Sequence, residues 1–155
     1  MRRKNFYVSL ISLSECDLGI RCLSAFLKTK GIKTKMFFLD SKEPRYNKET
    51  IKQLKELARD SNLICISVVN FSFNKAIQVT RELRKLKKPI VWGGPIVTVA
   101  PKMCIKYNNI ICLGEGEEAF LELAEKLNKK EEIELTKNFW FKRKNKIIRN
   151  ELRPL

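Results

Sequence analysis

The sequence predicts a doubly wound α/β domain in which five parallel strands form a sheet covered by helices on both faces. Short, unbroken apolar runs alternate with segments whose apolar residues recur at helical spacing. Strands buried on both faces are apolar throughout, and helices between successive strands give parallel, right-handed crossovers. With 155 residues, 44% of them hydrophobic, the chain can form one such domain with its own core.

The first half of the chain supplies three strands and two helices. Gly31 is a natural helix stop, and Asn47 is placed to cap a helix whose apolar face begins at Ile51. In chain order we expect a strand over 6–12, a helix over 20–27 that stops at Gly31, a strand over 35–39 that ends at Asp40, a helix over 47–58 and a strand over 63–69.

The second half continues the same alternation and completes the sheet. We expect a helix capped by Asn74 with its apolar face over 76–86, a strand over 89–92 that stops at Gly93, a short helix over 101–107, a strand over 110–113 and a helix over 116–128. The strand order expected for this flavodoxin-like or Rossmann-like pattern is 2-1-3-4-5. Folds of this kind bind ligands outside the carboxyl ends of their strands.

The pattern changes after residue 130. Aromatic and β-branched residues over 138–142 and 146–149 flank the turn Arg143-Lys144-Asn145, which predicts a β-hairpin. A lone hairpin is only marginally stable, so it should pack on another element. We therefore divide the chain into an α/β domain over 1–130 and a hairpin with the start of a linker over 131–155. The basic residues of 142–146 are expected to form a solvated hairpin tip and, secondarily, a contact for an acidic partner.

The absence of histidine and the pattern of cysteines exclude several kinds of site. Without histidine there is no Ser-His-Asp or Cys-His nucleophile and no imidazole metal ligand. The five cysteines form no C-x-x-C pair, so zinc and iron–sulfur sites are not expected. Such thiols are typical of reduced packing residues in the cytoplasm. No apolar run approaches the ~20 residues of a membrane helix, and the basic start over 1–4 is not followed by a signal-cleavage pattern.

The net charge of +15 raises nucleic-acid binding as an alternative function. Most of the lysines, however, fall on the polar faces of the predicted helices, where they would be solvated. The aromatic residues are not interleaved with them, as a base-stacking surface would require. We therefore keep a Rossmann-like interaction or nucleic-acid-binding module as the alternative and do not expect nucleic acid to be the partner.

Two features at strand ends are candidates for binding. Gly93 and Gly94, followed by Pro95, end the fourth strand, and paired glycines there permit positive φ angles or the close approach of another group. A tight turn is the structural alternative, and the sequence does not separate the two. Ser67 places a hydroxyl in the otherwise apolar third strand. A hydrogen bond from that hydroxyl to a nearby carbonyl is the structural alternative.

The segment 114–119 formally matches the G-x-G-x-x-A dinucleotide fingerprint. Its carboxylates, Glu115 among them, would repel a pyrophosphate at the helix N-terminus, so a dinucleotide site is not expected. A phosphorylated receiver domain is not expected either, because Asn70 stands where such a domain needs a carboxylate after its third strand.

Five segments together carry a resemblance to a known family. They are 18–27 with Gly31 and a strand ending at Asp40, then 66–69, 91–95, 113–117, and the hairpin exit 149–155. In this order and spacing they resemble the cobalamin-binding domain at the front of cobalamin-dependent radical S-adenosylmethionine enzymes. The match covers nearly the whole chain, and its last segment resembles the stretch that leads into that family's radical domain.

The resemblance implies a corrinoid that lies across the carboxyl edge of the sheet with its nucleotide tail running into the domain. The glycine pair would leave space for the tail, the serine would hydrogen-bond it, and the valine would form an apolar wall. The last loop would line the rim near the amides of the ring. The residues expected to bind the cofactor are Ser67, Val69, Gly93, Gly94, Pro95, Gly114, Glu115 and Gly116.

The chain departs from related cobalamin proteins in two ways that matter for function. It lacks the D-x-H-x-x-G loop that presents a histidine to cobalt. Many radical members of the family lack that ligand too, so the resemblance implies cobalamin in a base-off state without a protein histidine ligand. It also lacks a C-x-x-x-C-x-x-C motif, so an iron–sulfur cluster and S-adenosylmethionine would bind only in a downstream domain that is absent here. The expected function is that of a cobalamin-binding module of a methyltransferase-type radical enzyme, non-catalytic by itself. It would act with a radical domain in cis or in trans, or as a stand-alone carrier.

Overall fold

The computed structural model describes residues 6–39 and 42–154. Asp40, the expected end of the second strand, and the basic start over 1–4 lie outside the described residues. The elements are β1 (Tyr7–Ser12), α1 (Leu18–Thr29), β2 (Lys33–Phe38), α2 (Lys48–Ala58), β3 (Leu63–Ser67), the 3₁₀ turns η1 (Asn70–Ser72) and η2 (Arg84–Leu86), α3 (Phe73–Leu83), β4 (Ile90–Gly93), α4 (Pro95–Val99), α5 (Pro101–Cys104), β5 (Ile110–Cys112), α6 (Glu117–Lys129), β6 (Phe139–Arg143) and β7 (Lys146–Arg149).

These strands form one sheet in the order β2-β1-β3-β4-β5-β6-β7. Strands β1 to β5 are parallel and confirm the predicted order 2-1-3-4-5. The predicted hairpin is also present, but β6 pairs antiparallel with β5, so the sheet has seven strands and the expected count of five is too low. The hairpin thus finds its packing partner by extending the sheet.

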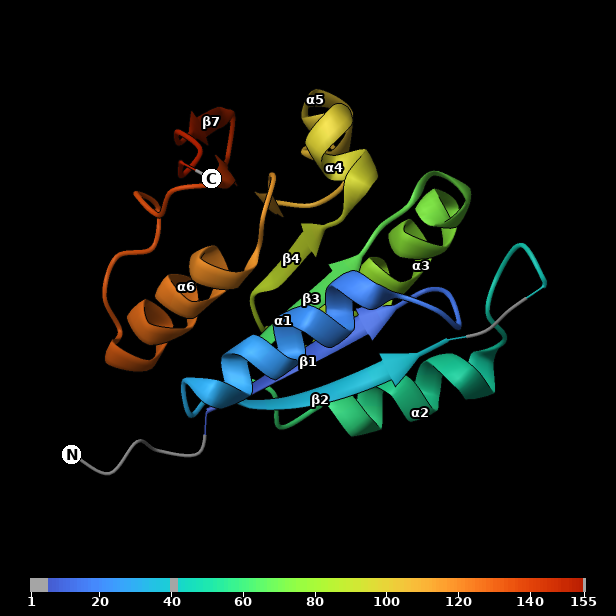
Figure 1. The fold of residues 1–155 in the computed structure, drawn as a ribbon. Helices are drawn as coiled ribbons and strands as arrows, with labels where there is room; N and C mark the ends of the chain where they lie inside the picture. Colours follow the sequence, from blue (N-terminus) through green and yellow to red (C-terminus); the bar gives the residue numbers. More distant parts are fainter. Residues whose placement is uncertain (1–5, 40–41, 155) are drawn as a thin grey trace.

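Helices cover both faces of the sheet, with α1 and α6 on one face and α2 and α3 on the other (Figure 1). Each face has its own apolar core. The core under α1 and α6 includes Leu23, Phe120 and Phe139, and the core under α2 and α3 includes Leu54, Val79 and Trp92. Burial of apolar side chains on both faces explains why the central strands β3, β4 and β5 are almost entirely hydrophobic, whereas the edge strand β2 begins with Lys-Thr-Lys and is only partly buried.

Local capping confirms one helix start and corrects another. The side chain of Asn47 accepts a hydrogen bond from the backbone N–H of Thr50 at 2.8 Å, as predicted for the cap of α2. Asn74, by contrast, lies inside α3, and the residue before that helix is Ser72. The Ser72 hydroxyl instead bonds the backbone N–H and carbonyl of Val69, which closes the tight turn η1 between β3 and α3.

The segment between β4 and β5 holds one more helix than predicted. The short helix α4 begins at Pro95, directly after Gly94, and the helix expected over 101–107 ends at Cys104. Proline is favourable at the first position of a helix because its φ is already helical and its missing N–H would have no helical acceptor. The β-branched residues of α4 concealed it in the sequence. Among the described residues, none of the helices is both long and apolar enough to cross a membrane.

Candidate binding site at the carboxyl edge of the sheet

The parallel strands end side by side and bring several predicted residues together. Ser67, at the end of β3, is in register with Ser12 of β1 on one side and with Gly93 of β4 on the other. The serine and the first glycine of the predicted site therefore lie on adjacent strands at the edge where α/β sheets bind ligands.

Ser67 is half-buried, and no hydrogen bond of its hydroxyl is found within the described part of the chain. The buried Ser9 of β1 differs, because its hydroxyl and that of Ser61, which precedes β3, bond each other at 2.5 Å. A hydroxyl that faces the edge without a protein partner can bond a ligand or water. This finding favours a binding role for Ser67 over the structural alternative.

The two glycines have different surroundings. Gly94 has φ +108° and ψ 176°, a conformation accessible essentially only to glycine. A Cβ there would lie 2.6 Å from the carbonyl oxygen of Val68, so the absence of a side chain lets the chain pass close to the end of β3. At Gly93 an added Cβ would meet nothing within 4 Å. The open space beside the paired glycines is therefore at Gly93, and Gly94 maintains the backbone that borders it.

Val69 and Pro95 border the same region. Val69 follows β3 and is half-buried, with its backbone held by the Ser72 hydroxyl as described above. Pro95 is exposed and opens α4 immediately after the glycine pair. Both residues thus lie at the ends of neighbouring central strands.

The last predicted loop, 114–116, connects β5 to α6. Gly114 has φ +69°, and its N–H donates to the hydroxyl of Thr98 at 3.0 Å, which ties this loop to α4. Gly116 precedes α6, and its carbonyl accepts from the N–H of Phe120 at 2.8 Å. Glu115 is exposed at the edge, so its carboxylate is available to a ligand. The neighbouring Glu117 and Glu118 lie in the first helical turn, where negative charge is favourable.

Exposed apolar side chains at this edge were missed by the sequence reasoning. They lie in the segments that follow β1, β3, β4 and β7, and such side chains are candidates to contact a ligand. These residues and their exposed fractions are Leu18 72%, Phe71 77%, Val99 81% and Leu152 54%. The available signal was an apolar residue shortly after each strand, but burial cannot be told from exposure without the fold.

A separate groove of about 540 Å³ lies between α2 and α3. None of the eight predicted binding residues lines it. Six cationic side chains and two carboxylates do: Arg45, Lys48, Lys52, Lys55, Arg59, Arg81, Glu56 and Glu82. Glu82 is paired with Lys85 at 2.7 Å, which lowers the pKa of its carboxyl. This basic groove belongs to the solvated helix faces predicted from the sequence, and it is not the site at the strand ends.

The described residues contain no cluster of three or more cysteine, aspartate or glutamate side chains that could hold a metal ion. Three of the five cysteines are buried and two are exposed. Burial raises the pKa of the Cys104 thiol to about 11 and that of Cys112 to about 12, and it raises the pKa of Cys65 well above its ordinary value. These thiols pack in the core, as the sequence predicted for Cys65 and Cys112.

Comparison with known families shows which family the chain belongs to. The family model described as "B12 binding domain" matches residues 6–124, which is most of the chain. The chain belongs to the B12-binding domain family. A search of curated proteins finds no match.

Solved structures similar to this B12-binding domain are cobalamin-dependent enzymes. A radical S-adenosylmethionine methyltransferase, TsrM from Kitasatospora setae, with cobalamin and a [4Fe-4S] cluster bound, matches 98% of this chain with a TM-score of 0.82 and 16% identity. A cobalamin-dependent S-adenosylmethionine radical enzyme, OxsB, with aqua-cobalamin and S-adenosylmethionine bound, matches 96% with a TM-score of 0.76 and 17% identity. The chain spans only 30% of the first structure and 22% of the second. These matches give the nucleic-acid alternative no support.

The contrast between the glycines predicts different effects of the same substitution. Gly94→Ala should lower the free energy of unfolding by at least about 1–3 kcal/mol, because its conformation excludes a side chain and the new methyl group would overlap the Val68 carbonyl. Gly93→Ala should change it by less than about 1 kcal/mol, since its Cβ has room. Urea denaturation measures both, and equal destabilisation would contradict this assignment.

The environments of the thiols predict selective labelling. At pH 8 a thiol reagent should modify Cys16 and Cys22, which are exposed, and should leave the other three unmodified because they are buried and protonated. All five should react in denaturant. Mass spectrometry of the labelled protein counts them, and rapid native labelling of Cys104 or Cys112 would show that the core is not packed as described.

Proposed function

We propose that this B12-binding domain binds cobalamin across the carboxyl edge of its sheet and is the cofactor-binding part of a methyltransferase-type radical S-adenosylmethionine enzyme. The observation that carries the proposal is the space at Gly93 beside the unbonded hydroxyl of Ser67, at the ligand-binding edge of a domain of this family. We infer that this space opens into a crevice, with the Ser67 hydroxyl at its entrance, that takes the nucleotide tail of the cofactor.

The rest of the edge fits a broad, largely uncharged macrocycle. The exposed side chains of Leu18, Phe71, Val99 and Leu152 offer apolar contacts around its perimeter. Each large apolar side chain that a ligand covers contributes up to about 1.5–3 kcal/mol by being removed from water. Val69 forms a wall of the crevice. Glu115, the Gly114 carbonyl and the Gly116 N–H would bond the amides at the rim of the ring, since the Gly114 N–H and the Gly116 carbonyl already have partners in the protein.

The cobalt would carry neither a histidine of this chain nor the cofactor's own base as its lower ligand. The chain has no histidine, and a nucleotide tail placed in the crevice at Gly93 draws the base away from the metal. Bound cobalamin would supply a cobalt centre able to carry a methyl group. The protein's contribution is to seat the ring and to hold its tail.

The reaction itself requires groups outside this sequence. The five cysteines lie at 16, 22, 65, 104 and 112, without the spacing of a radical S-adenosylmethionine cluster motif. The similar enzymes are far longer than this chain, and TsrM contains a [4Fe-4S] cluster. We therefore assign the cluster and S-adenosylmethionine to a domain that follows this one in cis or associates with it in trans. The cytoplasm, where thiols stay reduced, is the compartment that suits this role.

Reconstitution with hydroxocobalamin tests the function. After free cofactor is removed, the protein should retain the visible absorption of a corrinoid at about one equivalent. Reduced to the cobalt(II) form, it should lack the nitrogen superhyperfine splitting in electron paramagnetic resonance that an axial imidazole or the cofactor's base produces. A colourless protein would contradict cobalamin binding, and clear nitrogen splitting would contradict the base-off state.

Two variants test where the tail lies. Gly93→Leu should fill the crevice and reduce retention at least tenfold, and Ser67→Ala should reduce it less, by the value of one hydrogen bond, about 0.5–1.5 kcal/mol. Both should keep the native circular dichroism. Asn109→Leu, an exposed position at the amino end of β5, is the matched control and should bind as the unmodified protein does. Full retention by Gly93→Leu would show that the tail lies elsewhere.

A further inference from the structure

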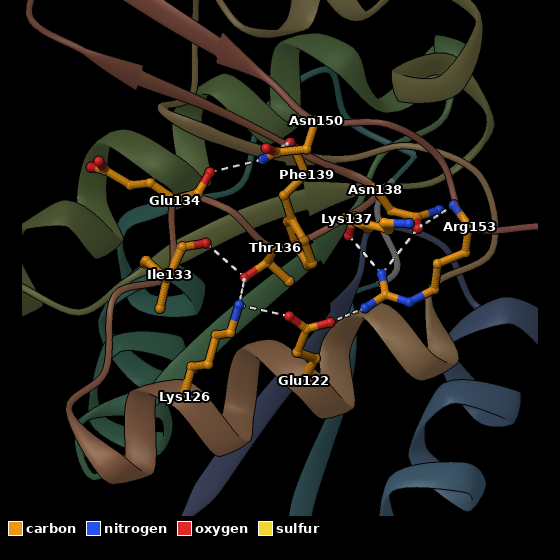
Figure 2. A network of polar contacts seen from close by, with 10 residues as sticks. All are labelled: Glu122, Lys126, Ile133, Glu134, Thr136, Lys137, Asn138, Phe139, Asn150 and Arg153. Carbon is orange, nitrogen blue, oxygen red and sulfur yellow. Dashed lines mark hydrogen bonds and ion pairs between the residues drawn. The ribbon is translucent and has the colours of Figure 1, made fainter.

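The segment after β7 folds back onto the body of the domain and is held there by a polar network (Figure 2). At its centre is Arg153, whose side chain is only 22% exposed. Its guanidinium forms an ion pair with Glu122 of α6 and donates to the carbonyl of Lys137 at 2.7 Å and to Oδ1 of Asn138 at 3.0 Å. Its backbone N–H donates to the same Asn138 oxygen, also at 3.0 Å. Arg153 thus joins the segment after β7 to α6 and to the start of β6.

Asn138 transmits this connection to the end of β5. It is buried and has φ +72°, in the left-handed region. Its side-chain amide donates to the carbonyl of Leu113 at 2.9 Å, while its own carbonyl accepts from the Leu113 N–H at 2.8 Å. Its N–H donates to the carbonyl of Glu151 at 2.9 Å. Leu113 immediately precedes the 114–116 loop. Asn138 therefore connects the segment after β7 to the start of that loop.

The other side of the loop is held through α6. Glu122 binds both Arg153 and Lys126, the latter at 2.6 Å. Lys126 in turn donates to the hydroxyl of Thr136 at 3.3 Å, and that hydroxyl donates to the carbonyl of Ile133 at 2.6 Å. The helix that begins just after Gly116 is therefore bound to the same network as Leu113, from which the loop starts.

The network also places an apolar side chain at the candidate site. A Cβ at Gly114 would lie 4.0 Å from Cδ2 of Leu152 and 3.5 Å from Nδ2 of Asn138. Leu152 stands between Glu151 and Arg153, which are both bonded to Asn138. More than half of its side chain is exposed. Its position over Gly114 is thus set by hydrogen bonds on both sides of it, and its apolar surface is left open beside the loop.

We infer that residues 150–154 form a clasp, with Arg153 as its positioning residue, that holds the 114–116 loop and Leu152 in the geometry that receives the corrinoid rim. This inference rests on the proposed function and adds to it a part of the site that is distant in sequence from the strand-end loops. In a longer protein the same clasp would place the start of the segment that follows residue 154 beside the bound cofactor. The occupancy of the site and the anchoring of that segment would then be coupled.

The clasp is tested by Arg153→Gln, which removes the charge that pairs with Glu122. Backbone hydrogen exchange of 113–116 in the cofactor-free protein should accelerate, while exchange in β1 and β3 should not change. Cobalamin retention should fall about tenfold, the effect of losing a hydrogen bond between charged groups. Arg149→Gln is the matched control: Arg149 lies on β7 against the ring of Trp140, 4.9 Å from its centroid, and its loss should alter neither measurement.

Three further variants keep the test decisive. Glu122→Gln should reproduce the effect, and the double variant with Arg153→Gln should be little worse than either single one, because both remove the same ion pair. Arg153→Lys keeps the charge but loses the forked geometry, so it should give an intermediate result and replaces Arg153→Gln if that variant does not fold.

The outcomes separate the clasp from the function on which it rests. If the unmodified protein retains cobalamin and Arg153→Gln retains it equally well, the clasp does not position the site, whether or not exchange changes. If the unmodified protein binds no cobalamin, the proposed function fails and the clasp's role in binding fails with it. Weaker retention together with faster exchange, confined to the loop, supports the clasp.

Discussion

The close approach of Gly94 to the backbone of Val68 is the constraint on which the candidate site depends. It allows the chain that leaves β4 to turn directly over the end of β3, where the Val68 N–H donates to the Gly93 carbonyl at 2.8 Å. Because the two strand ends are held so close, the space at Gly93 and the hydroxyl of Ser67 both lie at the carboxyl edge of the sheet. Any side chain at position 94 would separate these strand ends. The crevice that we propose there would therefore be a product of backbone packing.

The fold could be predicted because the burial of both sheet faces leaves a direct record in the sequence. The runs in β3, β4 and β5 are almost entirely apolar, β1 adds only two buried serines, and the helices between the strands show a clear apolar face. Turns and short helices were less predictable, since their ends depend on single contacts. Asn74 was chosen as a cap on residue type, whereas the Ser72 hydroxyl closes the turn two residues earlier. The helix α4 was missed because its β-branched residues resemble a strand.

The candidate site could be predicted only in part, for a similar reason. Residue types at strand ends make Ser67, Gly93 and the 114–116 loop candidates, and the parallel strands that precede them end at one edge. The structure also shows that Gly93 has room for a side chain and Gly94 has none, a difference that the sequence Gly-Gly does not reveal. The clasp was not predictable at all, because Arg153, Asn138 and Glu122 meet only after β6 and β7 have joined the sheet beside β5. The sequence reasoning placed the hairpin but left its partner unspecified.

The most direct test of the central claim compares cobalamin with cobinamide, the corrinoid that lacks the nucleotide tail, by equilibrium titration calorimetry. If the tail occupies the crevice beside Ser67, cobalamin should bind at least tenfold more tightly than cobinamide, and Gly93→Leu should abolish most of that difference. Equal affinity for the two corrinoids in the unmodified protein, or binding of neither, would contradict the account.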